Sequence, residues 1–287
     1  MLIVQTSAKI NLGLEIISKR DDGYHNISSV LQSVNMFDEI SLQFSDNLTF
    51  ASNVESLNNE SNLVMGAVRA FEDHTGIIVS LNIVLDKHIP IGMGLGGGSG
   101  NAAGVLYALN EIYSTGLSNK ELHILSSSLG ADVPFFLQGG TAVVGGIGDI
   151  ITPLDNVSED NLVLICPKIC LSNKTKSFFD KICSEDITDG SGIQKLCTDL
   201  LELNTFPSRL PDNVFSRILN DQFPQLLELR KLIQDELGTI MNITGTGLGM
   251  FAVTEEWKAL KHLVDSQYYD MYKMKTTDRA IEMRSNI

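Results

Sequence analysis

Residues 90–103, PIGMGLGGGSGNAA, place six glycines within nine positions and lead straight into a helical pattern. Apolar residues recur there at helical spacing, at Ala102, Val105, Leu106, Leu109 and Ile112. Glycine lets backbone N–H groups approach a ligand without a Cβ in the way, and a helix N-terminus adds unpaired donors and the positive end of its dipole. The stretch therefore predicts a loop that binds an anion such as phosphate, with a plain turn between strand and helix as the alternative.

The loop departs from the best-known phosphate motifs. Gly92, Gly94 and Gly97 satisfy the pattern G-x-G-x-x-G. A dinucleotide fold, however, needs a strand that runs directly into the loop and a carboxylate about 20 residues later. Pro90 interrupts that strand, and residues 114–118 hold no carboxylate. The Lys-Ser/Thr of a Walker A loop and the H-R-D and D-F-G sequences of protein kinases are absent as well. We therefore expect another nucleotide-binding design.

The composition is typical of a globular protein, with 287 residues of which 43% are hydrophobic and 20% charged. The net charge of −14 opposes binding to nucleic acid and to anionic membranes. No basic segment precedes the apolar N-terminal residues, and no run approaches about 18 apolar residues, so neither an export signal nor a membrane span is expected. Any phosphate site must be local, and a divalent cation would help it.

The four cysteines, at positions 166, 170, 183 and 197, form no C-x-x-C pair and have no histidine at zinc spacing. We expect buried, reduced thiols and a cytoplasmic protein.

The first third of the chain begins with an alternating pattern. Residues 8–16, AKINLGLEI, predict a half-buried strand that places Lys9 and Asn11 on one face. Residues 20–25, RDDGYH, have the composition of a turn. Alternation resumes at Ile40, Leu42 and Phe44, which predict another strand.

Four further segments complete the first half. A helix is expected over 62–76, closed by glycine, and a strand over 79–85 before the glycine loop. A capping box at Ser118 and Glu121 opens a helix that ends at Gly130. Residues 141–154 favour strands.

The second half begins after a polar link, and we expect a domain boundary near residue 155. Residues 162–166 predict a buried strand, and 225–237 a helix that ends at glycine. Residues 244–249, TGTGLG, form a second glycine loop before a strand-like MFAV.

Five segments, taken together, resemble the GHMP small-molecule kinase superfamily. They are AKINLGL (8–14), DGYH (22–25), PIGMGLGGGSGNAA (90–103), GADVPFF (130–136) and TGTGLGMFA (244–252). The DGYH element is similar to the branch whose acceptor carries a cytidyl group, in non-mevalonate isoprenoid biosynthesis, and it speaks against the mevalonate and homoserine branches. A nucleotide-binding protein on the same fold that transfers no phosphate is the alternative from another class, and a Rossmann-type oxidoreductase is a distant third.

The resemblance implies an α+β protein with the GHMP kinase fold. An N-terminal ATP-binding domain of the ribosomal protein S5 domain 2-like type would cover residues 1–155, and a smaller α/β substrate domain would cover 156–287, with the active site at their junction. The implied reaction transfers phosphate from ATP to an acceptor hydroxyl, with Mg²⁺ bridging the β and γ phosphates. No carboxylate pair stands out as a Mg²⁺ ligand. Monomer and weak homodimer are equally compatible with the sequence.

Phosphoryl transfer needs a group that receives the hydroxyl proton and a positive charge near the transferred phosphoryl. The resemblance implies Asp132 and Lys9 in these catalytic roles. From the residues alone, Asp132 has an alternative as the N-cap of a helix that includes Val133 and Pro134. Lys9 also has an alternative, as a solvated surface residue on a strand.

The resemblance also implies the binding residues. On the ATP side they are Pro90, Gly92, Gly94, Leu95, Gly96, Gly97, Gly98, Ser99, Gly100 and Asn101, with Asn62 and Lys87 near the adenine. On the acceptor side they are Asn11, Tyr24, His25, Thr175, Phe179, Gly245, Thr246 and Gly247.

Some of these residues have other readings. The family usually has a second hydroxyl residue where this chain has Gly100. Residues 175–179 would supply an aromatic wall for cytosine, although Phe178 and Phe179 could be core residues. His25 could be a surface histidine, and residues 244–249 a turn between strands.

Overall fold

The structure, a computed structural model, describes residues 1–169 and 174–285, without the side chains of residues 174 and 175. The strands are β1 (Leu2–Lys19), β2 (His25–Phe44), β3 (Thr49–Ser52), β4 (Leu81–Asp86), β5 (Thr141–Gly145), β6 (Ile150–Pro153), β7 (Leu162–Pro167), β8 (Asn242–Ile243), β9 (Met250–Val253), β10 (Tyr269–Met274) and β11 (Ile281–Ser285). The helices are α1 (Leu63–Thr75), α2 (Gly97–Ile112), α3 (Asn119–Leu129), α4 (Val133–Gln138), α5 (Lys174–Phe179), α6 (Ser191–Leu203), α7 (Ser216–Gln222), α8 (Pro224–Leu237) and α9 (Trp257–Leu263), with 3₁₀ turns η1 (Glu55–Leu57) and η2 (Ser184–Asp186).

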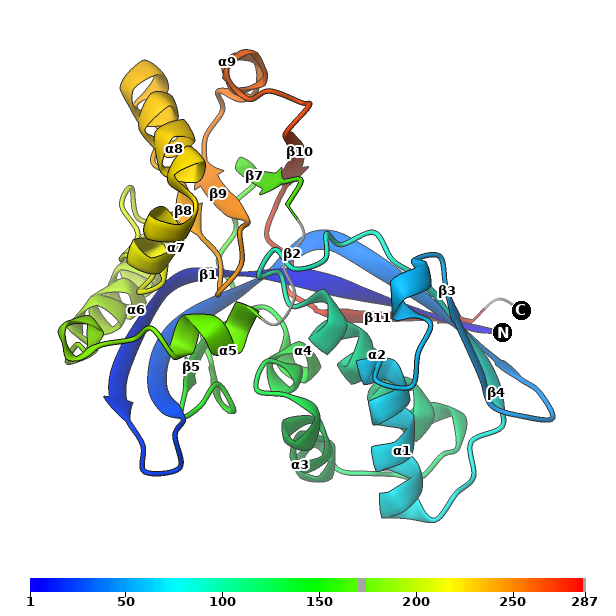
Figure 1. Cartoon of the computed structure of the whole chain (residues 1–287). Helices are drawn as coiled ribbons and strands as arrows, with labels where there is room; N and C mark the ends of the chain where they lie inside the picture. Colours follow the sequence, from blue (N-terminus) through cyan, green and yellow to red (C-terminus); the bar gives the residue numbers. More distant parts are fainter. Residues whose placement is uncertain (170–173, 286–287) are drawn as a thin grey trace.

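Two sheets organise the described residues. The larger has the order β11-β1-β2-β4-β3, with β5 paired to β2 and β6 paired to β5. Helices α1 to α4 lie along one side of the long strands β1 and β2, and the smaller sheet β10-β7-β9-β8 lies on the other side with α6 to α9 (Figure 1). This mixture of segregated helices and largely antiparallel strands confirms the α+β fold class.

Strand β1 separates a core face from the face that carries Lys9 and Asn11. The alternate residues Ile10 and Leu12 belong to the hydrophobic core that includes the smaller sheet. The predicted alternation holds from Lys9 to Leu12. It is wrong beyond that point, because the register shift between Asn11 and Gly13 brings Leu14, opposite Ser29, to the same face as Asn11, opposite Leu31. The expectation of a half-buried strand is wrong, because helices cover the Lys9 face and both faces are buried.

The pairing of β1 with β2 shifts register between Ser7 and Ala8 and again between Asn11 and Gly13. Such irregularities bend a strand and redirect its side chains. They bracket the segment that carries Lys9 and Asn11, so the local distortion sits where those side chains leave the sheet.

The predicted helices around the glycine loop are present. Helix α1 is capped by Asn62, whose side chain accepts a hydrogen bond from the Val64 N–H, and it ends at Gly76. Helix α3 opens with the predicted capping box of Ser118 and Glu121. Helix α2 begins at Gly97, two residues before Ser99, and α8 ends before Gly238 as expected.

Glycine allows α2 to lie directly on β1. A Cβ on Gly100 would stand 3.1 Å from the Ser7 carbonyl oxygen, and a Cβ on Gly104 would overlap the Thr6 side chain. The two residues lie one turn apart on the same helix face. The inward face of Gly100 gives a steric reason for glycine where a hydroxyl residue was expected.

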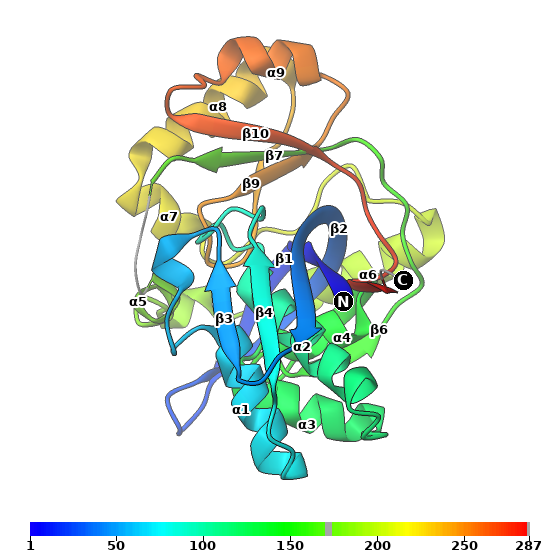
Figure 2. The ribbon, with the colours of Figure 1, turned by 90° about the vertical axis from the view of Figure 1, so that its right-hand side faces the viewer.

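The end of the chain returns to the larger sheet. Strand β11 pairs antiparallel with β1, from Leu2 opposite Ser285 to Thr6 opposite Ile281. The two ends of the chain therefore lie close together in both views (Figure 1, Figure 2). Residues after 156 thus contribute to both sheets, and the domain boundary near residue 155 stays a prediction.

The cysteines differ in burial. Cys166 is buried in β7, where burial raises the pKa of its thiol to about 12, with a further contribution from Asp270. Cys197 is half-buried, but Cys183 is exposed, so the expectation of buried thiols is wrong at that position. Cys170 lies outside the described residues. None of the helices in the described residues combines the length and apolarity that a membrane crossing requires.

Replacing Gly104 should test the contact between α2 and β1. We expect Gly104→Val to lower the free energy of unfolding by about 1–3 kcal/mol or more, because overpacking forces neighbouring groups apart. The measurement is equilibrium denaturation in urea. Gly145→Val is the control, since a Cβ at Gly145 meets nothing within 4 Å. Equal stability losses in both variants would contradict the close-packing account.

Candidate active site

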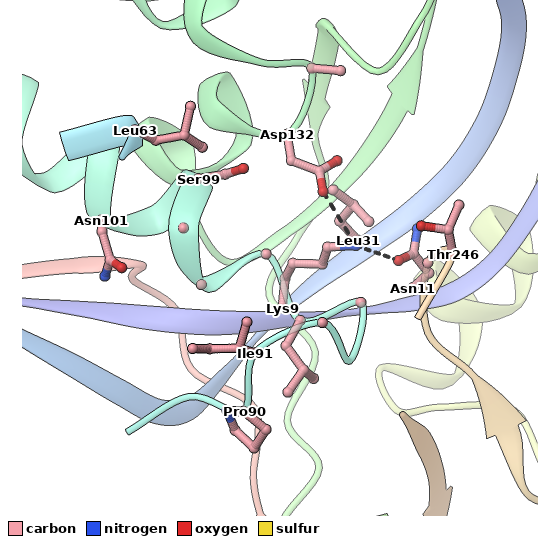
Figure 3. Close-up of a pocket in the computed structure, with 18 of the residues that line it drawn as sticks. Lys9, Asn11, Leu31, Leu63, Pro90, Ile91, Ser99, Asn101, Asp132 and Thr246 are labelled. Carbon is pink, nitrogen blue, oxygen red and sulfur yellow. Dashed lines mark hydrogen bonds and ion pairs between the residues drawn. The ribbon is translucent and has the colours of Figure 1, made fainter. Parts of the chain in front are cut away.

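A cavity of about 1000 Å³ lies where the two glycine loops meet β1 and β2. Its walls come from the η1 segment, the start of α1, the loop into α2, Asp132 and residues 245–246. Phe179 and Phe215 close the far end. The cavity is thus built from segments far apart in the sequence (Figure 3).

The two glycine loops pack against each other through backbone. A Cβ on Gly94 would overlap the Thr244 carbonyl, and one on Gly247 would overlap the Met93 carbonyl. The Gly249 N–H donates to the Met93 carbonyl at 3.2 Å. Only glycine permits this approach, because any side chain would hold the loops apart. The second loop is therefore more than a turn between strands.

Lys9 and Asp132 meet at the cavity wall. The Lys9 ammonium lies 3.6 Å from the Asp132 carboxylate, and 3% of the Lys9 side chain and 41% of the Asp132 side chain are exposed. Lys9 also donates to the Asn11 side-chain oxygen at 2.6 Å (Figure 3). Both residues line the cavity, with the carboxylate the more exposed of the two groups. The alternative of a solvated Lys9 is excluded.

Asp132 occupies the N-cap position of α4, but its side chain makes no capping hydrogen bond in the described part of the chain. Pro134 in the first turn lacks an N–H and so reduces the number of donors that need a cap. The capping alternative is therefore excluded, and the carboxylate is left for the cavity. A carboxylate there can receive a proton from a bound hydroxyl.

Asn11 is held by a hydrogen-bond network. Its amide nitrogen donates to the Ser29 hydroxyl at 2.9 Å, and that hydroxyl donates to the Gly13 carbonyl at 2.6 Å. The Asn11 backbone N–H donates to the Thr244 hydroxyl at 3.1 Å. The network orients the Asn11 side-chain oxygen, which accepts the hydrogen bond from the Lys9 ammonium. Ser29 lines the cavity and was missed, because a lone serine in a strand carries no sequence signal.

The first glycine loop is anchored to β1 by the Lys9 N–H, which donates to the Leu95 carbonyl at 2.9 Å. Gly96 adopts a left-handed conformation as the N-cap of α2, with φ of 68°. The loop thus aims the N-terminus of α2 into the cavity, where unpaired N–H groups favour an anion. The predicted residues that line it are Pro90, Gly92, Gly94, Leu95, Gly96, Gly97, Gly98, Ser99 and Asn101.

Gly100 is the exception in this loop. It lies outside the cavity lining defined by the described residues, and its N–H donates within the helix to the Gly96 carbonyl at 2.9 Å. The prediction that Gly100 contacts ATP does not fit this geometry, because the side of Gly100 where a Cβ would project packs on Ser7 and Phe136.

A buried carboxylate holds the loop from behind. Asp38 is fully buried and accepts from the backbone N–H groups of His88 and Ile89, both at 2.8 Å. It also pairs with the Lys87 ammonium and accepts from the Asn101 amide at 2.9 Å. Sequence reasoning missed Asp38, since its strand position resembles that of any exposed aspartate.

Lys87 and Asn101 line the cavity but direct their polar groups to Asp38. In Figure 3 the Asn101 side chain lies well away from Lys9 and Asp132. Burial lowers the pKa of Lys87, and Asp38 opposes this through its charge and hydrogen bond. These two residues therefore support the loop from beneath.

The adenine end of the predicted site is formed by α1 and η1. Asn62 lines the cavity, but its oxygen accepts from the Val64 N–H at 2.9 Å and its nitrogen donates to the Leu57 carbonyl at 3.0 Å. Its side chain thus orders this wall. Ser56 and Asn59 also line the cavity and were missed, because this polar segment resembles an ordinary loop.

The opposite end carries aromatic rings. Phe179 lines the cavity, stacks on His25 with centroids 5.6 Å apart, and meets Phe215 edge-on at 4.9 Å. Phe178 is a core residue with 1% exposure. Burial lowers the pKa of His25, Lys19 lowers it further, and Asp180 opposes the shift. A neutral imidazole offers one donor and one acceptor.

Three predicted acceptor-side residues lie elsewhere. His25 is not among the described residues that line the cavity but stacks on Phe179, which does line it, and Tyr24 is 60% exposed at the β1–β2 turn. Gly247 faces Met93 in the contact between the loops, whereas Gly245 and Thr246 line the cavity. The Thr175 side chain lies outside the described residues. Phe215 was missed, since its segment matched no motif.

The family model "GHMP kinases N terminal domain" matches residues 62–140. Three relatives named 4-diphosphocytidyl-2-C-methyl-D-erythritol kinase are similar over most of the chain. That of Persephonella marina is 36% identical, covering 88% of this chain and 91% of the relative. That of Francisella philomiragia is 35% identical and covers 96% of each. That of Alkaliphilus oremlandii is 31% identical, covering 98% of this chain and 99% of the relative.

Solved structures agree. A crystal structure of 4-(cytidine 5'-diphospho)-2C-methyl-D-erythritol kinase is 25% identical, with a TM-score of 0.79 over 96% of this chain and 98% of that one. Homoserine kinase from Cytophaga hutchinsonii is 19% identical with a TM-score of 0.73, over 99% and 97% of the two chains. At this low identity, the similarity to homoserine kinase shows only that the two proteins share a fold.

Replacing Asp38 should destabilise the chain and weaken ATP binding. We expect Asp38→Asn to lower the free energy of unfolding by about 3–5 kcal/mol, because the buried Lys87 ammonium loses its counter-charge. The KM for ATP should rise as the loop loses its anchor. Denaturation and steady-state kinetics measure the two effects.

Glu60→Gln is the control for this variant. Glu60 forms an ion pair with Arg69 at 3.0 Å, but its side chain is 85% exposed. A loss below about 1 kcal/mol is expected there. If Asp38→Asn changed stability as little as the control does, the buried network would not support the loop.

Proposed function

Because the chain belongs to the 4-diphosphocytidyl-2-C-methyl-D-erythritol kinase family, we propose that it transfers the γ-phosphoryl group of ATP to the 2-hydroxyl of that substrate. The products are ADP and the 2-phosphate, in non-mevalonate isoprenoid biosynthesis. The observation that carries the proposal is the Lys9–Asp132 pair, which lies between a helix N-terminus and a second glycine loop.

Asp132 receives the proton in this scheme. Its exposed carboxylate takes the proton of the acceptor 2-hydroxyl as that oxygen attacks the γ phosphorus. The new O–P bond forms while the bond from the γ phosphorus to the bridging oxygen breaks, and ADP leaves. Lys9 lines the same cavity and offers positive charge beside the transferred group.

The ATP phosphates bind over residues 94–99 in this proposal. Backbone N–H groups at the start of α2 supply the donors, so the site needs few basic side chains. The acceptor lies toward Phe179 and residues 245–246, where an aromatic face suits a nucleobase. Phosphoryl donor and acceptor then meet at Lys9 and Asp132.

Mg²⁺ accompanies ATP in this reaction class, where it neutralises phosphate charge. Within residues 1–169 and 174–285, no group of three or more His, Cys, Asp or Glu forms a metal cluster. The hydroxyl of Ser99 nevertheless provides an oxygen donor at the cavity wall, the type that Mg²⁺ prefers. We infer that the phosphates hold most of the cation and that the Ser99 hydroxyl is an additional donor to it.

The enzyme is expected in the cytoplasm. Cys166, Cys183 and Cys197 are free thiols, which a reducing compartment preserves.

Removing the carboxylate tests the catalytic pair. Asp132→Asn should lower kcat by about 10²–10⁴-fold, because an amide cannot accept the hydroxyl proton. ATP affinity, measured by calorimetry, should stay near that of the wild type. Asp199→Asn is the control, since Asp199 pairs with Lys195 at 2.7 Å outside the cavity. Wild-type turnover in Asp132→Asn would remove Asp132 from the mechanism.

A comparison of acceptors tests the substrate. ADP release with ATP and Mg²⁺ should require 4-diphosphocytidyl-2-C-methyl-D-erythritol and should not occur with mevalonate or homoserine. Turnover with either alternative would reject the proposed acceptor while keeping phosphoryl transfer. If no acceptor gave ADP, the chain would be a nucleotide-binding protein without transferase activity.

A further inference from the structure

Asn213 lies behind the acceptor end of the cavity and has no assigned role. The residue is 5% exposed and sits between β1 and α7. Its neighbours attach the segment to β1, since the Val214 N–H donates to the Leu14 carbonyl at 2.9 Å. In the part of the chain that the structure describes, Asn213 itself does not line the cavity.

The Asn213 amide joins two separate parts of the cavity wall. Its nitrogen donates to the carbonyls of Ile243 at 3.2 Å and Gly245 at 2.9 Å. Its oxygen accepts from the Phe215 backbone N–H at 2.9 Å. Three backbone partners therefore fix the orientation of this amide, which uses both of its N–H donors and its acceptor oxygen.

Two of the three partners, Gly245 and Phe215, line the cavity itself. A Cβ on Gly245 would stand 3.3 Å from the Lys9 ammonium and 3.4 Å from the Asn11 oxygen, so this backbone sets the space beside the catalytic pair. Phe215 meets Phe179 edge-on at 4.9 Å, and both rings line the far end. A shift at Asn213 would move both walls relative to Lys9.

We propose that Asn213 is a positioning residue that holds the aromatic wall and the second glycine loop at a fixed separation, and so determines how the acceptor hydroxyl is presented to Asp132. The inference rests on the proposed function, which places the acceptor at this end. Asn213 touches neither substrate, and its effect passes through the backbone of Gly245 and Phe215.

Two variants distinguish the hydrogen bonds that Asn213 donates to Ile243 and Gly245 from the one that it accepts from Phe215. Asn213→Asp keeps an acceptor for the Phe215 N–H but loses both donors, so it loosens the glycine loop. Asn213→Ala removes all three hydrogen bonds. Steady-state kinetics would give kcat and KM for each substrate, with thermal unfolding measured in parallel. If Asn213→Ala does not fold, Asn213→Asp alone decides the question.

Asn110→Ala is the matched control. Asn110 is 9% exposed, and its oxygen accepts from the Leu117 N–H at 2.8 Å while its nitrogen donates to the Leu117 carbonyl at 3.2 Å. It lies at the far end of α2, outside the described lining of the cavity. The control thus removes a buried asparagine that ties backbone together at the opposite end of α2 from the cavity.

Both Asn213 variants should lower kcat/KM for the acceptor by about 10- to 100-fold, the scale expected from misplacement of reacting groups. The KM for ATP should stay near that of the wild type, because α1 and α2 hold the nucleotide end. Asn110→Ala should lose stability without this selective loss.

The inference would be overturned if the Asn213 variants changed kcat/KM equally for acceptor and ATP, or if their kinetic constants matched those of Asn110→Ala. The proposed function would stand in either case. A wild-type protein without acceptor-dependent turnover would overturn the proposed function, and the inference with it.

Discussion

The contact between the two glycine loops is the constraint on which the site depends. Gly94 and Gly247 approach so closely that backbone packs on backbone, which joins the helix-covered side of β1 to the smaller sheet. Lys9 lies beside this contact because its N–H bonds to the first loop and its ammonium stands next to Gly245. Any side chain at either glycine would push the two loops apart.

The electrostatic design suits an acidic chain. A protein with net charge −14 repels phosphates at long range, so binding must come from local groups. Lys9 and Lys87 each stand near an aspartate, which leaves the N–H groups of α2 as the main source of positive potential. Backbone donors fixed by packing need little reorganisation when charge shifts during transfer.

Sequence reasoning found the parts of the site that rest on backbone chemistry. Glycine runs and helix caps report local conformation directly, so both loops and the helices beside them were predicted. Asp38, Ser29 and Asn213 were not, because each is a single polar residue whose role arises only when distant strands come together. Gly100 is the opposite case, since its place in the motif suggests a ligand contact while the structure packs the residue against Ser7 and Phe136.

The most direct test of the account is a crystal structure with a non-hydrolysable ATP analogue, Mg²⁺ and 4-diphosphocytidyl-2-C-methyl-D-erythritol bound together. The account predicts the γ-phosphate at the N-terminus of α2 and the acceptor 2-hydroxyl about 3 Å from the Asp132 carboxylate, a distance that permits proton transfer. A complex with the hydroxyl beyond the reach of Asp132, or with the γ-phosphate away from the first glycine loop, would contradict it.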